Sequence, residues 1–486
     1  MSQTKQKSIK INAILNVLTQ ASSVIFPLIL YPYISRRLGS ENFGKYNFAY
    51  VFVQYFMILE ALGIPTYVVR EASRIRDDKQ KVEKLVSELF TINMISALAS
   101  MLLMTAMTLS IGKINEYKDL IFILGFIVLS EALSRDWINT IYEDYLYRSL
   151  RYILSKVLCI VLVLILIHHP EDVNKYAVIT LITEAGAFLL NIFYCRRYVP
   201  YRLTLKPNFK QHLKPIFLLF FTSVAVKIYV QSDITILGII RNDKEVGVYT
   251  LASKIYSVIK AVLNAMIFVA IPRISYYMGE KNEEGYSNLI SNVKNALFTL
   301  IFPCIIGSAC LSHEIMMILG GEEYAGGERA LQILSVAILF AVMACYYSQA
   351  IMIPNREEKK FFIYTSVSAL VNIVLNIVLI PFLGMNGAAI TTVVAEAIIM
   401  TTSYRASRKY IYRKDNVKVL PIILGCGYVL GICLAIKLLD LGSVLTVILS
   451  VVAAVPGYFI ILLIGKNELV VNGLNSVKQK LKRKHD

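Results

Sequence analysis

This 486-residue sequence has almost no segment long enough to form a soluble domain. Long apolar stretches cover most of it, and the short segments between them contain no phosphate-binding glycine loop, nucleophile elbow or kinase-like set of motifs. We therefore do not expect an ATP-hydrolysing pump. We also expect no enzymatic activity and no catalytic residues.

Histidine and cysteine are scarce, with 5 and 7 residues. No Cys/His cluster has the spacing of metal ligands. All cysteines except Cys195 lie well within apolar stretches, which leaves no plausible disulfide. We therefore expect no metal site and no cofactor.

The apolar stretches have the length of membrane-spanning helices. A hydrocarbon core about 30 Å thick requires roughly 20 apolar residues per helix. The stretches are continuously apolar, without the alternation of barrel strands, so each must satisfy its own backbone as a helix. The sequence predicts an all-α integral membrane protein with fourteen transmembrane helices. The predicted spans are 11–34, 44–69, 86–110, 117–134, 152–168, 176–194, 213–240, 247–271, 290–312, 329–353, 361–382, 385–404, 419–438 and 442–464.

Basic residues outnumber acidic ones, 50 to 33, and are unevenly distributed between the loops. If residue 1 is cytoplasmic, the segments predicted inside carry 37 Lys and Arg, and those predicted outside carry 10. This asymmetry obeys the positive-inside rule, so both termini are predicted to be cytoplasmic. Topology and contact with anionic headgroups explain the net charge of +17, and nucleic acid is not an expected partner.

The pattern apolar-Gly-x-Tyr-x-x-Ala occurs twice, in Phe43–Ala49 and Val246–Ala252. Each copy leads into an apolar span and is followed about twenty residues later by a proline. The repeat predicts two parallel six-helix copies, as in transporters whose halves rock around a central site. The predicted divisions are an N-terminal half over 1–210, a C-terminal half over 211–415, an extra helix pair over 416–466 and a basic cytoplasmic tail over 467–486.

Several short motifs, in order along nearly the whole chain, resemble those of one transporter family. They are Ser35–Gly39 with Phe43–Tyr46, Asp233–Gly238 with Val246–Tyr249 and Ala252–Lys254, Gly320–Tyr324, and Asn372, Asn376, Pro381, Gly384, Gly387–Ala389 and Glu396. The sequence is similar to the polysaccharide-repeat flippases of O-antigen and capsule assembly. These form the polysaccharide transporter branch of the multidrug/oligosaccharidyl-lipid/polysaccharide exporter superfamily.

The resemblance implies a flippase in the bacterial cytoplasmic (inner) membrane. Such a protein moves an undecaprenyl-diphosphate-linked oligosaccharide from the cytoplasmic to the outer leaflet by alternating access, without hydrolysing ATP. The implied partners are the lipid-linked oligosaccharide and the bilayer, with glycan polymerase and ligase machinery as further candidates.

Two alternatives stay open. A drug or small-molecule exporter of the same superfamily would share the architecture, and a carboxylate-dominated cavity with few cations would favour it. A polytopic glycan polymerase would act on the same lipid-linked sugars. Such enzymes generally need a sizeable outer loop, and the predicted loops are short, which disfavours this second alternative.

Ionisable groups within the spans indicate where the pathway lies, because they are costly in lipid and should face a bundle interior or a wet cavity. Lys227 and Lys254 could together hold a lipid diphosphate. Gln231, one turn from Lys227, and Asp233 belong to the same candidate site. Structural pairing of Lys227 with Asp233 or a Glu is an equally open interpretation. In the family the resemblance names, cavity cations are often Arg, and these central ones are Lys.

Further candidates divide by expected role. Those for substrate binding are Arg36, Arg37, Arg70 and Arg273 at helix ends, with Asn16 and Gln20 on a polar stripe of the first span. Those for ion coupling are the carboxylates Glu60 and Glu396. Those for a hinge are Pro27, Pro32, Gly63 and Pro65, because they interrupt the helical hydrogen-bond ladder.

Overall fold

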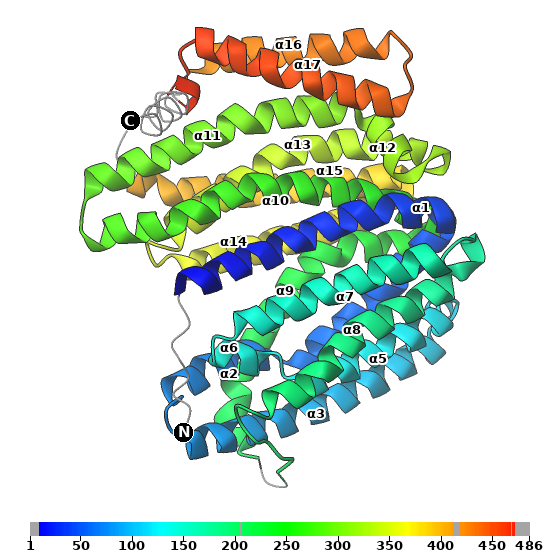
Figure 1. Ribbon diagram of the computed structural model, residues 1–486, viewed down its shortest axis with the longest axis vertical. Coiled ribbons are helices and arrows are strands. Elements are labelled where there is room, and N and C mark those ends of the chain that lie inside the picture. Colours follow the sequence, from blue (N-terminus) through cyan, green and yellow to red (C-terminus); the bar gives the residue numbers. More distant parts are fainter. Residues whose placement is uncertain (1–8, 205–206, 412–417, 468, 472–486) are drawn as a thin grey trace, which may run out of the picture. The chain divides into compact units, whose positions relative to one another are not determined.

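The chain is built from helices joined by short turns (Figure 1). The computed structural model describes residues 9–204, 207–411, 418–467 and 469–471; the side chains of 9–18, 20, 21, 24 and 222 lie outside this description. No strand occurs within those ranges. Twelve helices in the described part are long and apolar enough to cross a membrane. The protein is therefore a multi-pass membrane protein, and the predicted all-α class is confirmed.

The count of twelve differs from the predicted fourteen in two places. The segment Ile25–Arg74 counts once, although it covers the last part of the first predicted span and the whole of the second. The helix at the fourth predicted span, Lys118–Ser134, has 17 residues and is not among the twelve. Fourteen crossings and cytoplasmic termini stay predictions.

Two compact units make up the chain, Met1–Gly247 and Val248–Asp486. The divisions at 210, 415 and 466 stay predictions, and most of the predicted basic tail lies outside the described residues. The elements of the first unit are α1 (Ile9–Ala61), α2 (Ile64–Arg74), α3 (Lys79–Ser110), α4 (Gly112–Asn115), α5 (Lys118–Ser134), α6 (Trp137–Ile141), α7 (Tyr145–Leu166), η1 (Pro170–Asp172), α8 (Val173–Cys195) and α9 (Phe209–Ile240).

The second unit begins within α10 (Asp243–Gly279). Its other elements are α11 (Glu283–Cys310), α12 (Ser312–Gly320), η2 (Glu322–Gly327), α13 (Glu328–Cys345), the π-helical η3 (Tyr346–Met352), α14 (Glu358–Leu383), α15 (Met385–Ser407), η4 (Arg408–Tyr410), α16 (Val419–Lys437) and α17 (Ser443–Ile464).

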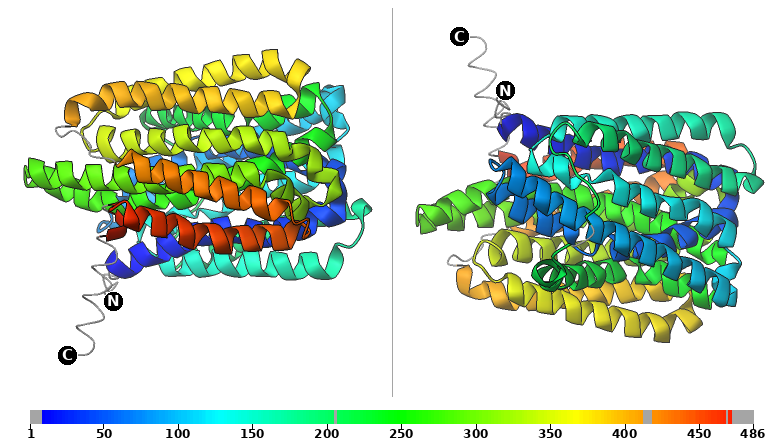
Figure 2. Two further views of the ribbon diagram at one scale, coloured as in Figure 1. Left: turned by 90° about the horizontal axis from the view of Figure 1, so that it is seen from above. Right: turned by 90° about the horizontal axis from the view of Figure 1, so that it is seen from below.

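Within each unit, long helices pack side by side. In the first unit α1 packs against α3, α5, α7 and α9, and α5 packs against α8. In the second, α15 packs between α13 and α14, and α16 packs against α17 and α11. Figure 2 shows these helices from two further directions. The packing leaves the first unit with polar side chains of α1, α5, α7 and α8 on facing surfaces.

Polar residues in the turns fix where several helices begin. The side chains of Asp78, Asn208 and Asn282 accept a hydrogen bond from a backbone amide in the first turn of α3, α9 and α11, at 3.1, 3.4 and 2.8 Å. Such caps satisfy amides that have no partner within the helix. They place the helix starts outside the apolar runs.

The breaks in the first helices fall at glycines. α1 continues through Pro27 and Pro32, and its non-helical residue is Gly39 (φ 72°, ψ 170°). A second break follows α1, where Leu62 and Gly63 have positive φ and Pro65 lies in the first turn of α2. The predicted hinge residues thus divide into two inside a continuous helix and two at a break. A hinge role for any of them stays a prediction.

The two copies of the repeated motif contact each other through their glycines. A Cβ atom built on Gly44 would lie 1.8 Å from the carbonyl oxygen of Asp243, and one built on Gly247 would lie 2.0 Å from that of Ser40. A Cβ on Gly238 would lie 2.2 Å from the Phe48 ring. At these positions the glycines of the motif permit close approach of the two backbones.

Tyr458 joins α17 to α11. Its buried hydroxyl donates a hydrogen bond to the Thr299 carbonyl oxygen at 2.6 Å, and its ring packs against Gly425. We expect Tyr458→Ala to lower the free energy of unfolding by about 3 kcal/mol, because it leaves a cavity. Tyr458→Phe should cost about 1 kcal/mol, because only the hydrogen bond is lost. Equal shifts for both variants in denaturant unfolding of the detergent-purified protein would contradict this account.

Candidate functional site

Two adjoining cavities with several charged lining residues lie within the first unit, with volumes of about 520 and 480 Å³. They share three lining residues, Glu131, Asp136 and Arg148. The first is otherwise lined by Glu60, Ala61, Pro65, Thr66, Val69, Arg70, Asn93, Trp137 and Thr140. The second is otherwise lined by Thr19, Ser23, Tyr145, Ser149, Arg151, Tyr152, Ser155, Lys156, Glu184, Ala187 and Phe188.

The turn between α5 and α6 brings a carboxylate into both cavities. Arg135 follows the last residue of α5 and has a left-handed backbone conformation (φ 50°). Its buried guanidinium group lies between two aromatic rings, 4.1 Å from the centroid of Phe90 and 3.6 Å from that of Tyr201. Stacking of this kind stabilises a buried cation. The anchored turn presents the next residue, Asp136, to the cavity.

A second anchor holds the start of α7. Asp144 is buried and accepts hydrogen bonds from Arg197 at 2.8 Å and from the Tyr198 hydroxyl at 2.5 Å. Burial, and then the Asp144 carboxylate, raise the pKa of Tyr198. The tyrosine therefore stays a hydrogen-bond donor at neutral pH. This contact fixes the position of the first turns of α7, which carry the cavity's arginines.

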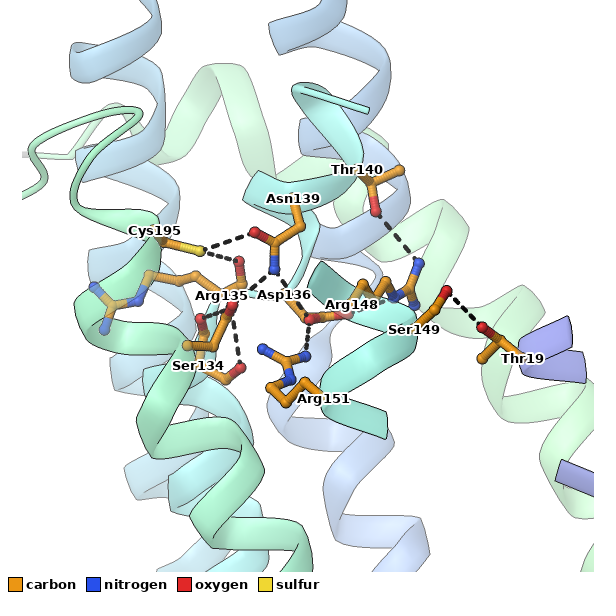
Figure 3. Close-up of polar contacts among 11 residues, drawn as sticks. Thr19, Ser134, Arg135, Asp136, Asn139, Thr140, Arg148, Ser149, Arg151 and Cys195 are labelled. Atoms are coloured by element: carbon orange, nitrogen blue, oxygen red, sulfur yellow. Dashed lines mark hydrogen bonds and ion pairs between the residues drawn. The ribbon is translucent and has the colours of Figure 1, made fainter. Parts of the chain in front are cut away.

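Asp136 lies between two arginines of α7 (Figure 3). Arg148 Nε is 2.7 Å from Asp136 Oδ2, and Arg151 forms an ion pair with the other carboxylate oxygen. The Arg151 side chain is 8% exposed, whereas that of Arg148 is 45% exposed. Arg151 Nη1 has no hydrogen-bond partner among the described residues. Two guanidinium groups thus share one carboxylate, which leaves a net positive charge that an anionic ligand can neutralise.

A further ion pair lines the second cavity. Lys156 Nζ lies 3.0 Å from Glu184 Oε1, and the Tyr50 hydroxyl lies 3.3 Å from the same carboxylate. The hydroxyl of Thr19 donates to Ser149 at 2.7 Å, which links α1 to α7. The side of α7 that lines the second cavity therefore carries hydroxyl groups and a cation.

Two of the predicted binding residues on α9 contact α1. Gln231 Nε2 donates to Gln54 Oε1 at 3.0 Å, and Lys227 Nζ donates to the same oxygen. Lys227 is also close enough to Glu131 for their charges to interact. Asp233 is buried in the same helix. The structure brings Lys227 and Gln231 together as their spacing predicts, and substrate binding by them stays a prediction.

The other predicted residues include two that belong to the second unit. Lys254 is exposed. Glu396 is buried, and it pairs with Lys260 at 3.4 Å and accepts a hydrogen bond from Tyr256 at 3.0 Å. Lys227 and Lys254 belong to different units, so a joint diphosphate site stays a prediction. Glu396 differs from Glu60 in having a cationic partner.

The remaining candidates have varied surroundings. Arg70 lines the first cavity and is 2.9 Å from Glu71. Arg36, Arg37 and Arg273 are exposed; Arg37 lies over the Tyr33 ring, and Arg273 donates to the Tyr277 hydroxyl at 3.0 Å. The side chains of Asn16 and Gln20 lie outside the described part of the chain.

Sequence reasoning missed the charged residues of α7. It placed Arg148, Arg151 and Lys156 in or next to a cytoplasmic loop, where they counted only as topology signals. Arg148 and Arg151 are three residues apart, which puts them on one helix face, and Tyr145 and Tyr152 flank them. Basic residues at i and i+3 close to an apolar run were the available signal.

Known proteins share this fold and parts of this sequence. Residues 9–278, more than half of the chain, match the model of a family described as polysaccharide biosynthesis protein. This chain belongs to the polysaccharide biosynthesis protein family. The family predicted from the motifs is thereby confirmed. Residues 219–378 of this family member also match a second model, described as MatE.

Relatives of this polysaccharide biosynthesis protein carry transporter names. A protein of Escherichia coli (strain K12) named as an O-antigen transporter is 23% identical over 408 residues, which are 82% of this chain and 96% of the relative. A protein of Haloferax volcanii named as a low-salt glycan biosynthesis flippase is 27% identical over 36% of this chain and 37% of its own. Both relatives are named for transport.

Solved structures resemble the fold of this family member. The lipid II flippase MurJ, in an inward closed conformation, has a TM-score of 0.75 at 16% identity, covering 95% of this chain and 99% of its own. An inward-facing multidrug resistance MATE family transporter of the MOP superfamily has a TM-score of 0.61 at 15% identity, covering 82% and 98%.

Proposed function

We propose that this protein is a flippase for lipid-linked oligosaccharides used in surface polysaccharide assembly. The observation that carries the proposal is the cavity of the first unit, where Arg148 and Arg151 share the single carboxylate of Asp136. Cations in a low-dielectric membrane cavity attract phosphate strongly and are costly unless they have a use. The relatives named as O-antigen transporter and glycan flippase support the same conclusion.

The substrate we propose is an undecaprenyl-diphosphate-linked oligosaccharide. Its diphosphate would replace part of the Asp136 interaction, because guanidinium groups bind phosphate in a bidentate manner. Thr140, Ser149 and Ser155 line the same cavities and offer hydroxyl groups for sugars. The protein would move this substrate from the cytoplasmic to the outer leaflet of the bacterial inner membrane by alternating access. Polymerase and ligase machinery would act on the product.

A drug exporter of the same superfamily is the second candidate. The MatE match and the carboxylates Glu60 and Glu131 in the first cavity favour it. The arginines disfavour it, because a cationic drug would be repelled by the net positive charge around Asp136. The two candidates therefore differ in the charge of the expected substrate.

Depletion of the protein in its native cells distinguishes the candidates. We expect lipid-linked repeat units to accumulate on the cytoplasmic leaflet, because the polar headgroup cannot cross the hydrocarbon core unaided. The measurement is the amount of lipid-linked oligosaccharide with its leaflet assigned. Unpolymerised units on the outer leaflet would indicate a polymerase, and an unchanged glycan pool would contradict the flippase.

A further inference from the structure

Two cysteines meet where α11 packs against α16 in the second unit (Figure 1). Cys310 is the last residue of α11, and Cys433 lies one turn before the end of α16. Cys433 is 1% exposed within a cluster of buried apolar side chains, and the partly buried Cys310 packs against the same cluster. Their thiol groups are close enough to act on each other as hydrogen-bond partners. The fold thus brings together two thiols that are far apart in the sequence.

Lys437 holds the ends of these helices in place. Its ammonium group donates a hydrogen bond to the Cys310 carbonyl oxygen at 3.0 Å and forms an ion pair with Glu314 of α12 at 3.1 Å. Cys433 is one helical turn before Lys437, so the two side chains lie on the same face of α16. The position of Cys433 beside Cys310 therefore follows from this polar contact as well as from the packing of the thiols.

The two thiols differ in accessibility, as a disulfide formed by exchange requires. Cys310 is partly exposed, so an oxidant can reach it, whereas Cys433 is buried. The predicted orientation puts the C-terminal ends of α11 and α16 on the outer side of the membrane, which is where disulfides form and persist. The sequence predicts no disulfide because the cysteines lie in apolar runs. The fold favours one, because both thiols lie near helix ends and a disulfide needs little more than adjacent sulfur atoms.

We propose that Cys310 and Cys433 form a disulfide bond that fastens the pair of helices α16 and α17 to α11. The oxidant is itself a disulfide, carried by a thiol–disulfide exchange protein of the outer compartment. The Cys310 thiolate attacks this disulfide, forms a mixed disulfide and releases one thiolate. The Cys433 thiolate then attacks the Cys310 sulfur and displaces the second thiolate. The two cysteines are oxidised, and the donor is reduced to two thiols that take up their protons.

The bond has a structural consequence that does not depend on the transported substrate. α16 packs against α11 and α17, and the bond makes its attachment to α11 covalent. A cross-link between distant positions restricts the unfolded chain. We therefore expect the oxidised protein to be more resistant to unfolding than the reduced protein.

Mass spectrometry of the protein from its native cells tests the bond. Thiols are blocked with N-ethylmaleimide before the cells are opened, and the purified full-length chain is digested without reductant. We expect the peptides of Cys310 and Cys433 to be linked, and to separate after reduction. Alkylated thiols at both positions, or a link from either cysteine to a different residue, would overturn the proposal.

Other cysteines of the same helices provide a matched control. Cys304 lies on α11 and lines the same apolar cavity as Cys433, and Cys426 lies on α16. Cys304→Ala with Cys426→Ala should keep the link, whereas Cys433→Ala should abolish it and leave Cys310 open to alkylation. Loss of the link in the control variant would contradict the pairing. If that variant does not accumulate, the linked peptides of the wild type decide the pairing.

Unfolding of the detergent-purified protein tests the fastening. Wild type treated with oxidised glutathione should have a higher unfolding midpoint than wild type treated with dithiothreitol. Cys433→Ala should show no difference between the two treatments. Equal midpoints for oxidised and reduced wild type would overturn the fastening of the helix pair.

Discussion

Neutralising the arginine cluster should abolish glycan export without unfolding the protein. The variant is Asp136→Asn with Arg148→Gln and Arg151→Gln, which replaces all three charges of the cluster by amides of similar size. Removing the arginines alone would leave the partly buried Asp136 without these two cations, and the resulting instability could imitate a loss of binding. The triple variant avoids this, so export reports on anion binding.

The expected effect is large. A hydrogen bond to a charged group is worth about 1.5 to 3 kcal/mol, and each 1.4 kcal/mol is tenfold in affinity. Losing two guanidinium contacts to a diphosphate should therefore weaken substrate binding by at least about 100-fold. The measurement is the amount of exported glycan in depleted cells that express the variant at wild-type level.

A control pair separates this effect from a general loss of charge. Arg76 and Glu143 form a half-exposed ion pair at 3.0 Å that lines neither cavity. Arg76→Gln with Glu143→Gln should keep export close to wild type, because exposed ion pairs contribute little to stability. Export by the triple variant equal to that of this control would exclude a role of Arg148 and Arg151 in substrate binding.

The fold could be predicted from hydropathy, and the cavity could not. Continuous apolar runs identify helices because lipid offers the backbone no alternative partner. The same reasoning assigns charges near a span's end to a loop. α7 begins at Tyr145, seven residues before the predicted span, and this extension carries Arg148 and Arg151. These arginines face a cavity because Arg135 packs between two aromatic rings and Asp144 binds Arg197 and Tyr198. Neither contact can be read from the sequence.

Contacts between residues on different helices could not be predicted from the sequence either. Lys227 and Gln231 are correctly placed on one face by their spacing, but their common acceptor, Gln54, lies 173 positions from Lys227. Glu60 and Glu396 look alike as isolated carboxylates in apolar runs. Their environments differ. Glu396 pairs with Lys260 and accepts a hydrogen bond from Tyr256, whereas Glu60 accepts one from Asn93 and has no ion-pair partner among the described residues. Spacing along the sequence shows which residues share a face of one helix. Contacts between different helices can be identified only in the folded structure.

Gly44→Ala is expected to prevent stable folding. The added methyl group would lie 1.8 Å from the Asp243 carbonyl oxygen and 2.9 Å from the Gly247 amide nitrogen. These are backbone atoms, which cannot move aside as a flexible side chain can. Overpacking typically costs 1 to 3 kcal/mol, and a clash with backbone should exceed about 3 kcal/mol. The measurement is the unfolding midpoint and the yield of monodisperse protein in detergent.

Two further glycines make this prediction specific. Gly186→Ala adds a methyl group that meets no described atom within 4 Å beyond its chain neighbours and the backbone of its own helix. It should therefore leave the midpoint unchanged or raise it slightly, because Ala favours helix. Gly238→Ala should have an intermediate effect, because its methyl group meets the Phe48 side chain, which can shift, and not backbone. The expected order of destabilisation is therefore Gly44, then Gly238, then Gly186. A Gly44→Ala protein as stable as Gly186→Ala would show that the two motif copies do not approach each other through their glycines.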